Sequence, residues 1–218
     1  MSFQAQRRHF FKSICDLALA LGLMVLAATG HAQDAPKVKI ATNMGDIMVE
    51  LYPDKAPKTV ANFLQYVKDK HYNGTIFHRV IANFMIQGGG YDAQYKERAT
   101  RPPVQHEGRQ AMAAGLKNQA GYLAMARTND PQSATAQFFI NTVDNAFLDP
   151  TPIPEGDPVK RFEYQGRVYD NVPRANLLNA PQLFGYTVFG KVVSGMDVVQ
   201  KIKEIGRASC RERVSSPV

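Results

Sequence analysis

Hydrophobic and polar positions alternate with a period of two residues near the start of the folded part of the chain. The alternation covers residues 38–42 and again 47–51, and the four residues NMGD between them are typical of a turn. A period of two places successive side chains on opposite faces of a strand. The pattern therefore predicts a β-hairpin with one buried face.

The period then changes to that of a helix. Val60, Phe63, Leu64 and Val67 have the i, i+3, i+4, i+7 spacing of an amphipathic helix, and Pro57 suits its first turn. A second helix is predicted over residues 196–202. Each of these helices is expected to bury one face.

Most of the remaining apolar runs are short and are separated by Gly, Asn and Asp turns. They cover residues 75–81, 84–87, 122–126, 137–141 and 187–193. Short strands with few helices between them favour a mainly β fold, an antiparallel barrel closed at its ends by helices. The segment 150–181 holds six of the 13 prolines, so we expect it to leave the barrel as a long irregular insertion.

Both ends of the chain differ from this folded part. Three basic residues among the first twelve precede an apolar run at 17–28 that is too short to span a bilayer, which is typical of a signal peptide over 1–32, cleaved before Gln33. The run QRRHFFK at 6–12 also resembles a twin-arginine signal, which leaves the export route open.

The tail over 204–218 begins with EIGRASCRERV, which resembles the translation of a sequencing-library adapter. The alternative is a genuine basic tail. If the tail is foreign, Cys210 is not native, and Cys15 leaves with the signal peptide. The mature domain, residues 33–203, then has no cysteine and no basis for disulfide chemistry.

Charge and motifs exclude several classes of function. Residues 33–203 carry 20 Lys and Arg against 16 Asp and Glu, a net charge of +4, and the basic residues are scattered, which argues against nucleic acid as a partner. The sequence has no GxSxG, HExxH, CxxC or P-loop motif. The separations between His71, His78 and His106 match no common metal site. We expect no metal, no cofactor and no stable membrane span.

Three segments carry a specific resemblance: FHRVIANFMIQGGG at 77–90, YLAMART at 122–128 and AQFFIN at 136–141. In these motifs and their order the chain resembles the cyclophilins, above all the periplasmic members of bacteria. The resemblance runs over about 37–202, apart from 150–181. It implies a closed eight-stranded antiparallel barrel with two helices and an outer peptide groove, and isomerisation of X-Pro bonds in exported periplasmic proteins without a cofactor.

The resemblance also assigns the site. The FHRV motif makes Arg79 the catalytic residue. The residues that it places against the substrate peptide and its proline ring are Phe84, Met85, Gln87, Ala126, Arg127, Gln137, Phe139, Phe147, Leu148 and Tyr186. A guanidinium stays protonated at any physiological pH, so Arg79 can stabilise a twisted imide whose resonance is lost. The alternative is a non-catalytic chaperone or scaffold that keeps the proline pocket.

Three features depart from the family pattern. Phe147 stands where many eukaryotic members have tryptophan, which predicts weak cyclosporin binding. Tyr186 stands where many members have histidine. The tail stands where the family has a final strand that pairs with the first, so we expect that strand to be missing and one edge of the barrel to be unpaired.

Overall fold

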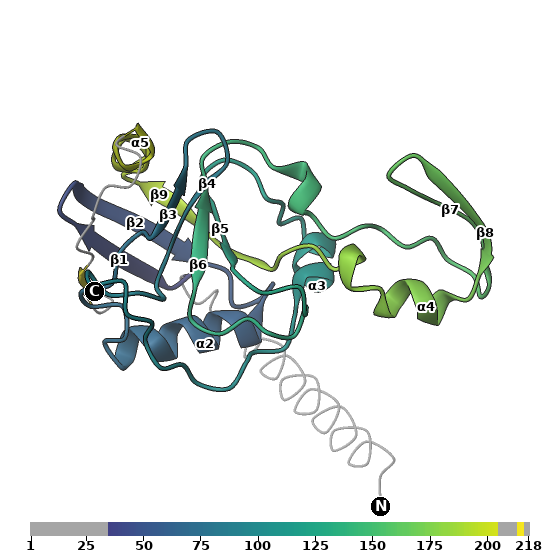
Figure 1. Cartoon of the computed structure of the whole chain (residues 1–218), viewed down its shortest axis with the longest axis horizontal. Coiled ribbons are helices and arrows are strands. Elements are labelled where there is room, and N and C mark those ends of the chain that lie inside the picture. Colours follow the sequence, from purple (N-terminus) through teal and green to yellow (C-terminus); the bar gives the residue numbers. More distant parts are fainter. Residues whose placement is uncertain (1–34, 205–212, 216–218) are drawn as a thin grey trace, which may run out of the picture. The chain divides into compact units, whose positions relative to one another are not determined.

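The main body of the protein is one antiparallel sheet with helices beside it. The computed structural model describes residues 35–204 and 213–215 (Figure 1). In chain order the elements are β1 (Lys37–Thr42), β2 (Gly45–Leu51), α2 (Pro57–Lys68), β3 (Arg79–Ile81), β4 (Met85–Gly88), α3 (Gly108–Ala113), β5 (Tyr122–Met125), β6 (Phe138–Asn141), η2 (Ala146–Leu148), β7 (Val159–Tyr164), β8 (Arg167–Val172), α4 (Arg174–Asn179), η3 (Pro181–Leu183), β9 (Val188–Ser194), α5 (Met196–Glu204) and β10 (Arg213–Ser215).

The sheet joins eight strands in the order β10-β1-β2-β9-β5-β6-β4-β3, each pair antiparallel. The predicted hairpin is confirmed, since β1 pairs with β2 from Lys37↔Glu50 to Thr42↔Gly45. The mainly β class and the eight strands agree with the prediction. No pairing joins β3 to β10 among the described residues, so closure of the sheet into a barrel stays a prediction.

The two predicted helices are present as α2 and α5, which lie on different sides of the sheet in Figure 1. The short helices α3 and α4 were not predicted. The strand expected over 75–81 was too long, because only β3 pairs within the sheet. Ile76 instead bonds to the carbonyl of Tyr91, and Thr75 bridges to Asp92, so this stretch pairs with a neighbouring loop.

The core lies between the sheet and α2. Phe63, buried on α2, packs its ring 5.2 Å from that of Tyr72, 5.5 Å from that of Phe138 and 5.2 Å from that of Phe189. Aromatic contacts at these distances favour a fixed arrangement beyond simple burial. The predicted apolar face of this helix therefore holds together segments that are far apart in the sequence.

The outer edge of β1 is paired, so the prediction of a missing strand and an open edge was wrong. β10, within the tail, pairs with β1 at Lys39↔Ser215, Ile40↔Val214 and Ala41↔Arg213. Ladder bonds join backbone groups, so a strand of almost any sequence can cover an edge. The foreign origin of 204–218 stays a prediction. Residues 205–212 and 216–218, and the predicted signal peptide at 1–32, lie outside the described residues.

The prediction that the insertion, residues 150–181, is irregular was wrong, because the segment forms a hairpin and a helix. β7 pairs with β8, and the two residues between them, Gln165 and Gly166, have φ values of 50° and 74°. Positive φ at both central residues is the signature of a type I′ hairpin turn. Pro158 and Pro173 lie just outside the two strands, so neither removes a ladder bond.

The insertion also has a small core of its own. Val159 and Phe162 of β7 pack with Leu177 of α4 and with Leu183, separately from the main core. In Figure 1 the hairpin and α4 lie beyond one end of the sheet. This second cluster explains how a proline-rich segment forms regular structure.

Candidate active site

A small cavity on the sheet brings together nine of the eleven predicted site residues. Its volume is about 80 Å³, and the side chains around it are Arg79, Phe84, Met85, Gln87, Ala126, Arg127, Phe139, Leu148 and Tyr186. These residues come from segments more than 100 positions apart in the sequence. We call this hollow the proline cavity, after the ring that the family resemblance predicts it to hold.

The apolar part of the proline cavity is formed by strand pairing. Met85 on β4 and Phe139 on β6 are buried, and the register Gln87↔Phe139 sets these neighbouring strands side by side. The ring of Phe139 meets that of Tyr186 edge-on at 5.5 Å. Rigid strands thus hold an apolar recess open to solvent on one side.

The polar part is a chain of three side chains. Nη1 of Arg79 donates to Oε1 of Gln87 at 3.3 Å, and Nε2 of Gln87 donates to Oε1 of Gln137 at 2.9 Å. The guanidinium also lies 5.8 Å from the centre of the Phe84 ring. Arg79 is exposed while Gln87 and Gln137 are half-buried, so the two glutamines orient a cation at the edge of the recess.

Gln137 does not line the proline cavity itself. It lines a neighbouring cavity of about 270 Å³ that shares Gln87, Ala126 and Arg127 with the proline cavity. Through the bond to Gln87 it still acts on the position of Arg79. A peptide lying across both hollows would meet polar groups on this side.

Phe147 does not line the proline cavity either. Its ring stacks on that of Phe84 at 5.6 Å, with an interplanar angle of 23°. The side chain is 75% exposed, the largest exposure among the exposed large hydrophobic residues of the described chain. Phe147 therefore forms an outer rim, while its neighbour Leu148 lines the cavity as predicted.

Two further residues, Gly185 and His106, support the wall that carries Tyr186, and neither was predicted from the sequence. The carbonyl of Gly185 accepts from Nε of Arg127 at 2.9 Å and lies 3.3 Å from Nε2 of His106. The guanidinium of Arg127 lies 4.6 Å from the centre of the Tyr186 ring. Gly185 has φ of 62°, and a Cβ there would collide with the backbone of Asp149 and Pro150. The glycine in FGY was the available sequence signal.

The imidazole of His106 is held in its neutral form. Burial is the main cause that lowers its pKa to about 4, and the nearby Arg127 and Arg109 lower it further. The backbone N–H of Gly108 donates to Nδ1, which leaves the proton on Nε2 facing the carbonyl of Gly185. His106 is therefore a structural donor behind the Tyr186 wall.

The described residues form neither a metal cluster nor a membrane-spanning helix. Across 35–204 and 213–215, no three His, Cys, Asp or Glu side chains come together as a possible metal site. Within the same ranges, no helix combines the length and the apolar character that a bilayer span requires.

Comparison with known proteins agrees with this geometry. The family model described as cyclophilin type peptidyl-prolyl cis-trans isomerase/CLD matches residues 37–218. A peptidyl-prolyl cis-trans isomerase of Acinetobacter baylyi is 45% identical over 189 residues, covering 87% of this chain and 82% of the relative. Peptidyl-prolyl cis-trans isomerase B of Escherichia coli is 46% identical over 179 residues, 81% and 91% of the two chains.

A solved structure supports the fold. The crystal structure of a Cryptosporidium parvum cyclophilin type peptidyl-prolyl cis-trans isomerase superposes with a TM-score of 0.51. Its identity is 23%, with 84% of this chain and 96% of that one covered, so it bears on the fold alone. From the family match and the bacterial relatives together, the chain belongs to the cyclophilin-type peptidyl-prolyl cis-trans isomerases.

Proposed function

We propose that this isomerase rotates X-Pro bonds of exported proteins at the proline cavity, with Arg79 as its catalytic residue. The observation that carries the proposal is the guanidinium of Arg79, bonded to Gln87, at the edge of an apolar recess sized for one ring. Met85, Phe139 and Leu148 hold the ring, and Gln87 and Gln137 bond to the peptide backbone or orient Arg79.

The chemistry needs no nucleophile. Amide resonance sets a rotation barrier of roughly 18–20 kcal/mol, and uncatalysed exchange takes on the order of 10–100 s. As resonance is lost, the imide nitrogen becomes pyramidal and gains a lone pair. A cationic donor aimed at that lone pair stabilises the twisted state more than the planar one, which lowers the barrier.

The test is a proline-isomerisation assay on a short X-Pro peptide. The chain beginning at Gln33 is compared with its Arg79→Ala variant and with Arg161→Ala, an exposed arginine on β7 that is outside the cavity. We expect Arg79→Ala to lower kcat/KM at least about tenfold and Arg161→Ala to leave it unchanged. If the folded wild type does not raise the isomerisation rate above the uncatalysed rate, the proposal is wrong.

The second candidate is a non-catalytic chaperone or scaffold that binds proline peptides. It is favoured only if calorimetry detects peptide binding in the proline cavity while the assay detects no acceleration. The arginine at position 79 speaks for the enzyme, because binding of an apolar ring alone gives no reason for a cation at the edge of the recess.

We also propose that residues 1–32 export the protein to the periplasm, where its clients fold. The support is the basic start, the short apolar run and the small residues before Gln33. Fractionation of cells and sequencing of the mature N-terminus test this. Replacing Arg7 and Arg8 by lysine separates the routes, since a twin-arginine signal depends on the pair. Protein found only in the cytoplasm would contradict export.

Weak cyclosporin binding belongs to the same proposal. Phe147 takes the place of the tryptophan that many eukaryotic members carry, and its ring lies at the outer rim beside Phe84. A phenyl ring covers less of a bulky ligand than an indole and lacks an N–H donor.

A further inference from the structure

The proline cavity is too small to account for recognition of a peptide. A volume of about 80 Å³ holds one ring, and ligand sites are usually several times larger. A second and larger cavity, of about 590 Å³, lies between the body of the protein and the insertion. Phe147, Lys117 and Asp149 line it from the body, and Tyr164, Gln165 and Gln182 line it from the insertion side. We call it the insertion cavity.

The insertion cavity continues from the proline cavity across a single aromatic pair. Phe84 lines the proline cavity, Phe147 lines the insertion cavity, and the two rings stack at 5.6 Å. Leu148 and Asp149, adjacent in sequence, line one cavity each. A peptide that seats its proline in the small hollow would therefore pass over Phe147, whose 75% exposure it would reduce.

The insertion is fastened to the body, so the cavity wall is a built structure. Nη1 of Arg109, on α3, donates to the carbonyl of Leu178 at 2.9 Å, at the last turn of α4. The same guanidinium lies 4.4 Å from the centre of the Phe184 ring, next to the wall that carries Tyr186. The N–H of Thr151 bonds to the carbonyl of Leu183 at 3.0 Å.

The charges that line the insertion cavity are not equivalent. Oδ1 of Asp149 accepts from the backbone N–H of Asn118 at 2.7 Å and from its side-chain amide at 2.9 Å. Lys117 is exposed and, within the described part of the chain, forms no ion pair within 4.0 Å. Oδ1 of the carboxylate is therefore engaged, while the ammonium is available to an incoming group.

We propose that the insertion cavity is a second substrate subsite, which binds the residues flanking the proline on one side and prefers an acidic side chain there. The proposal rests on the proposed function, since the occupant is the isomerase's own substrate. The peptide residues on the other side of the proline would lie toward the 270 Å³ cavity that Gln137 lines. The insertion would thus make this enzyme selective for peptide sequence beyond the X-Pro pair.

The experiment measures kcat/KM for three peptides: an X-Pro tetrapeptide, and two decapeptides that extend it with a Glu-containing segment on either the amino or the carboxyl side. We expect one decapeptide to gain about tenfold over the tetrapeptide, the size of one or two added contacts. Lys117→Glu and Gln182→Trp should abolish that gain and leave the tetrapeptide rate unchanged. Both positions are exposed, so these variants should fold.

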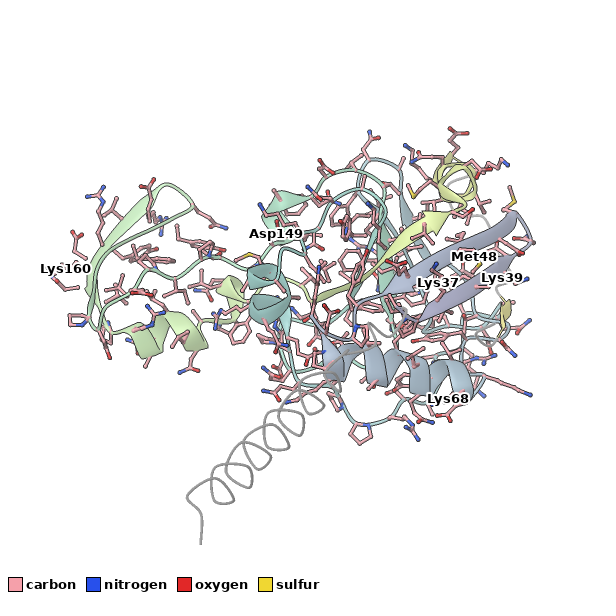
Figure 2. The ribbon with its side chains drawn as sticks, turned by 180° about the vertical axis from the view of Figure 1, so that it is seen from behind. Lys37, Lys39, Met48, Lys68, Asp149 and Lys160 are labelled. Carbon is pink, nitrogen blue, oxygen red and sulfur yellow. The ribbon has the colours of Figure 1, made fainter. Side chains whose placement is uncertain are left out.

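Lys160→Glu is the matched control, a charge reversal on β7. Figure 2 labels Lys160 on the hairpin, far from Asp149, and its side chain does not line the insertion cavity. The Lys160→Glu variant should keep the full rise in kcat/KM of the decapeptide over the tetrapeptide. When Lys replaces Glu in the decapeptide, kcat/KM should be higher for the Lys117→Glu variant than for the wild type.

Failure of this proposal differs from failure of the proposed function. If the tetrapeptide itself is not turned over, the isomerase assignment at the proline cavity falls and the subsite falls with it. If the tetrapeptide is turned over but neither extension raises kcat/KM, the subsite is overturned while the isomerase stands. An equal loss in Lys160→Glu and Lys117→Glu would also overturn it, because the effect would then be one of net charge.

Discussion

Arg79 and Gln87 face each other across β3 and β4 as register partners, and their side chains meet at 3.3 Å between Nη1 and Oε1. Strand pairing alone therefore sets the guanidinium that we propose as catalytic beside an amide. That amide is itself fixed by Gln137, 50 residues further along the chain. The guanidinium is thus positioned by two elements that do not depend on substrate.

Removing the amide at position 87 should cost activity through Arg79. We expect Gln87→Ala to lower kcat/KM about tenfold on a short X-Pro peptide, because the guanidinium loses its partner and spends less time in the productive position. The check is a double-mutant cycle. If Gln87 acts only by positioning, adding Gln87→Ala to Arg79→Ala should have no further effect, and a full additive loss would contradict this account.

A larger ring at position 147 should strengthen cyclosporin binding. Phe147→Trp adds area and an N–H donor at a side chain that is already 75% exposed, so it creates no clash in the core. We expect Kd for cyclosporin, measured by calorimetry, to fall about tenfold, while activity on a short peptide stays within about twofold. Leu178→Trp, another exposed apolar position, is the control. An unchanged affinity would show that the rim at Phe147 does not determine binding.

Acid should destabilise the protein through His106. Its folded pKa of about 4 lies below the ordinary value of 6.5, because burial disfavours the charged ring. The stability that depends on the neutral ring is complete above pH 6.5 and is lost as the pH falls toward 4, where the unfolded chain takes up the proton first. Between pH 7 and pH 4.5 we expect a loss of about 1–2 kcal/mol in the free energy of unfolding.

Urea unfolding at the two pH values measures this loss, and His106→Gln is the comparison. The variant should be less stable than the wild type at pH 7, because the bond to the carbonyl of Gly185 is disturbed, and its pH dependence should be smaller. The pKa values of His71 and His78 are also lowered by burial, so part of the dependence should remain. Identical slopes in the two proteins would refute the assignment to His106.

The start of α2 should depend on a carboxylate from a distant part of the chain. Glu107 is 5% exposed, and its carboxylate accepts from the N–H of Lys58 at 3.0 Å and from the N–H and hydroxyl of Thr59, each at 2.8 Å. It satisfies orphan donors that no residue before the helix caps, since Ala56 has no side-chain oxygen.

We expect Glu107→Ala to lower the free energy of unfolding by about 1–3 kcal/mol, because the buried N–H of Thr59 and the partly buried N–H of Lys58 lose their acceptor. Glu107→Gln, which keeps one acceptor oxygen, should lose less. Chemical denaturation measures both, with Glu97→Ala as a control outside the α2 contacts. A loss of less than about 0.5 kcal/mol for Glu107→Ala would mean that water replaces the carboxylate.

The local elements could be predicted from the sequence because each depends on neighbouring residues. The hairpin of β1 and β2 follows from a period of two, and α2 follows from a period of 3.6 with Pro57 in its first turn. The three cyclophilin-like motifs likewise carried the family and seven of the nine residues of the proline cavity, since each motif is a short contiguous run; Leu148 and Tyr186 lie outside the three motifs.

Contacts between distant segments could not be predicted this way. The bond between Gln87 and Gln137, the contact of His106 with Gly185 and the cap that Glu107 gives to α2 join positions 50, 79 and 49 residues apart in sequence. Such pairs leave no periodic signal, because either residue would look the same without its partner. Only the tertiary structure brings them together.

The insertion and the tail illustrate the same limit. Proline content predicted an irregular segment at 150–181, but its prolines flank the strands β7 and β8, and burial of Phe162 against α4 stabilises the hairpin. The tail was expected to leave the edge of β1 unpaired, yet β10 pairs with β1 through backbone groups that every residue has. Sequence determined the chemistry that is available, and packing determined which groups meet.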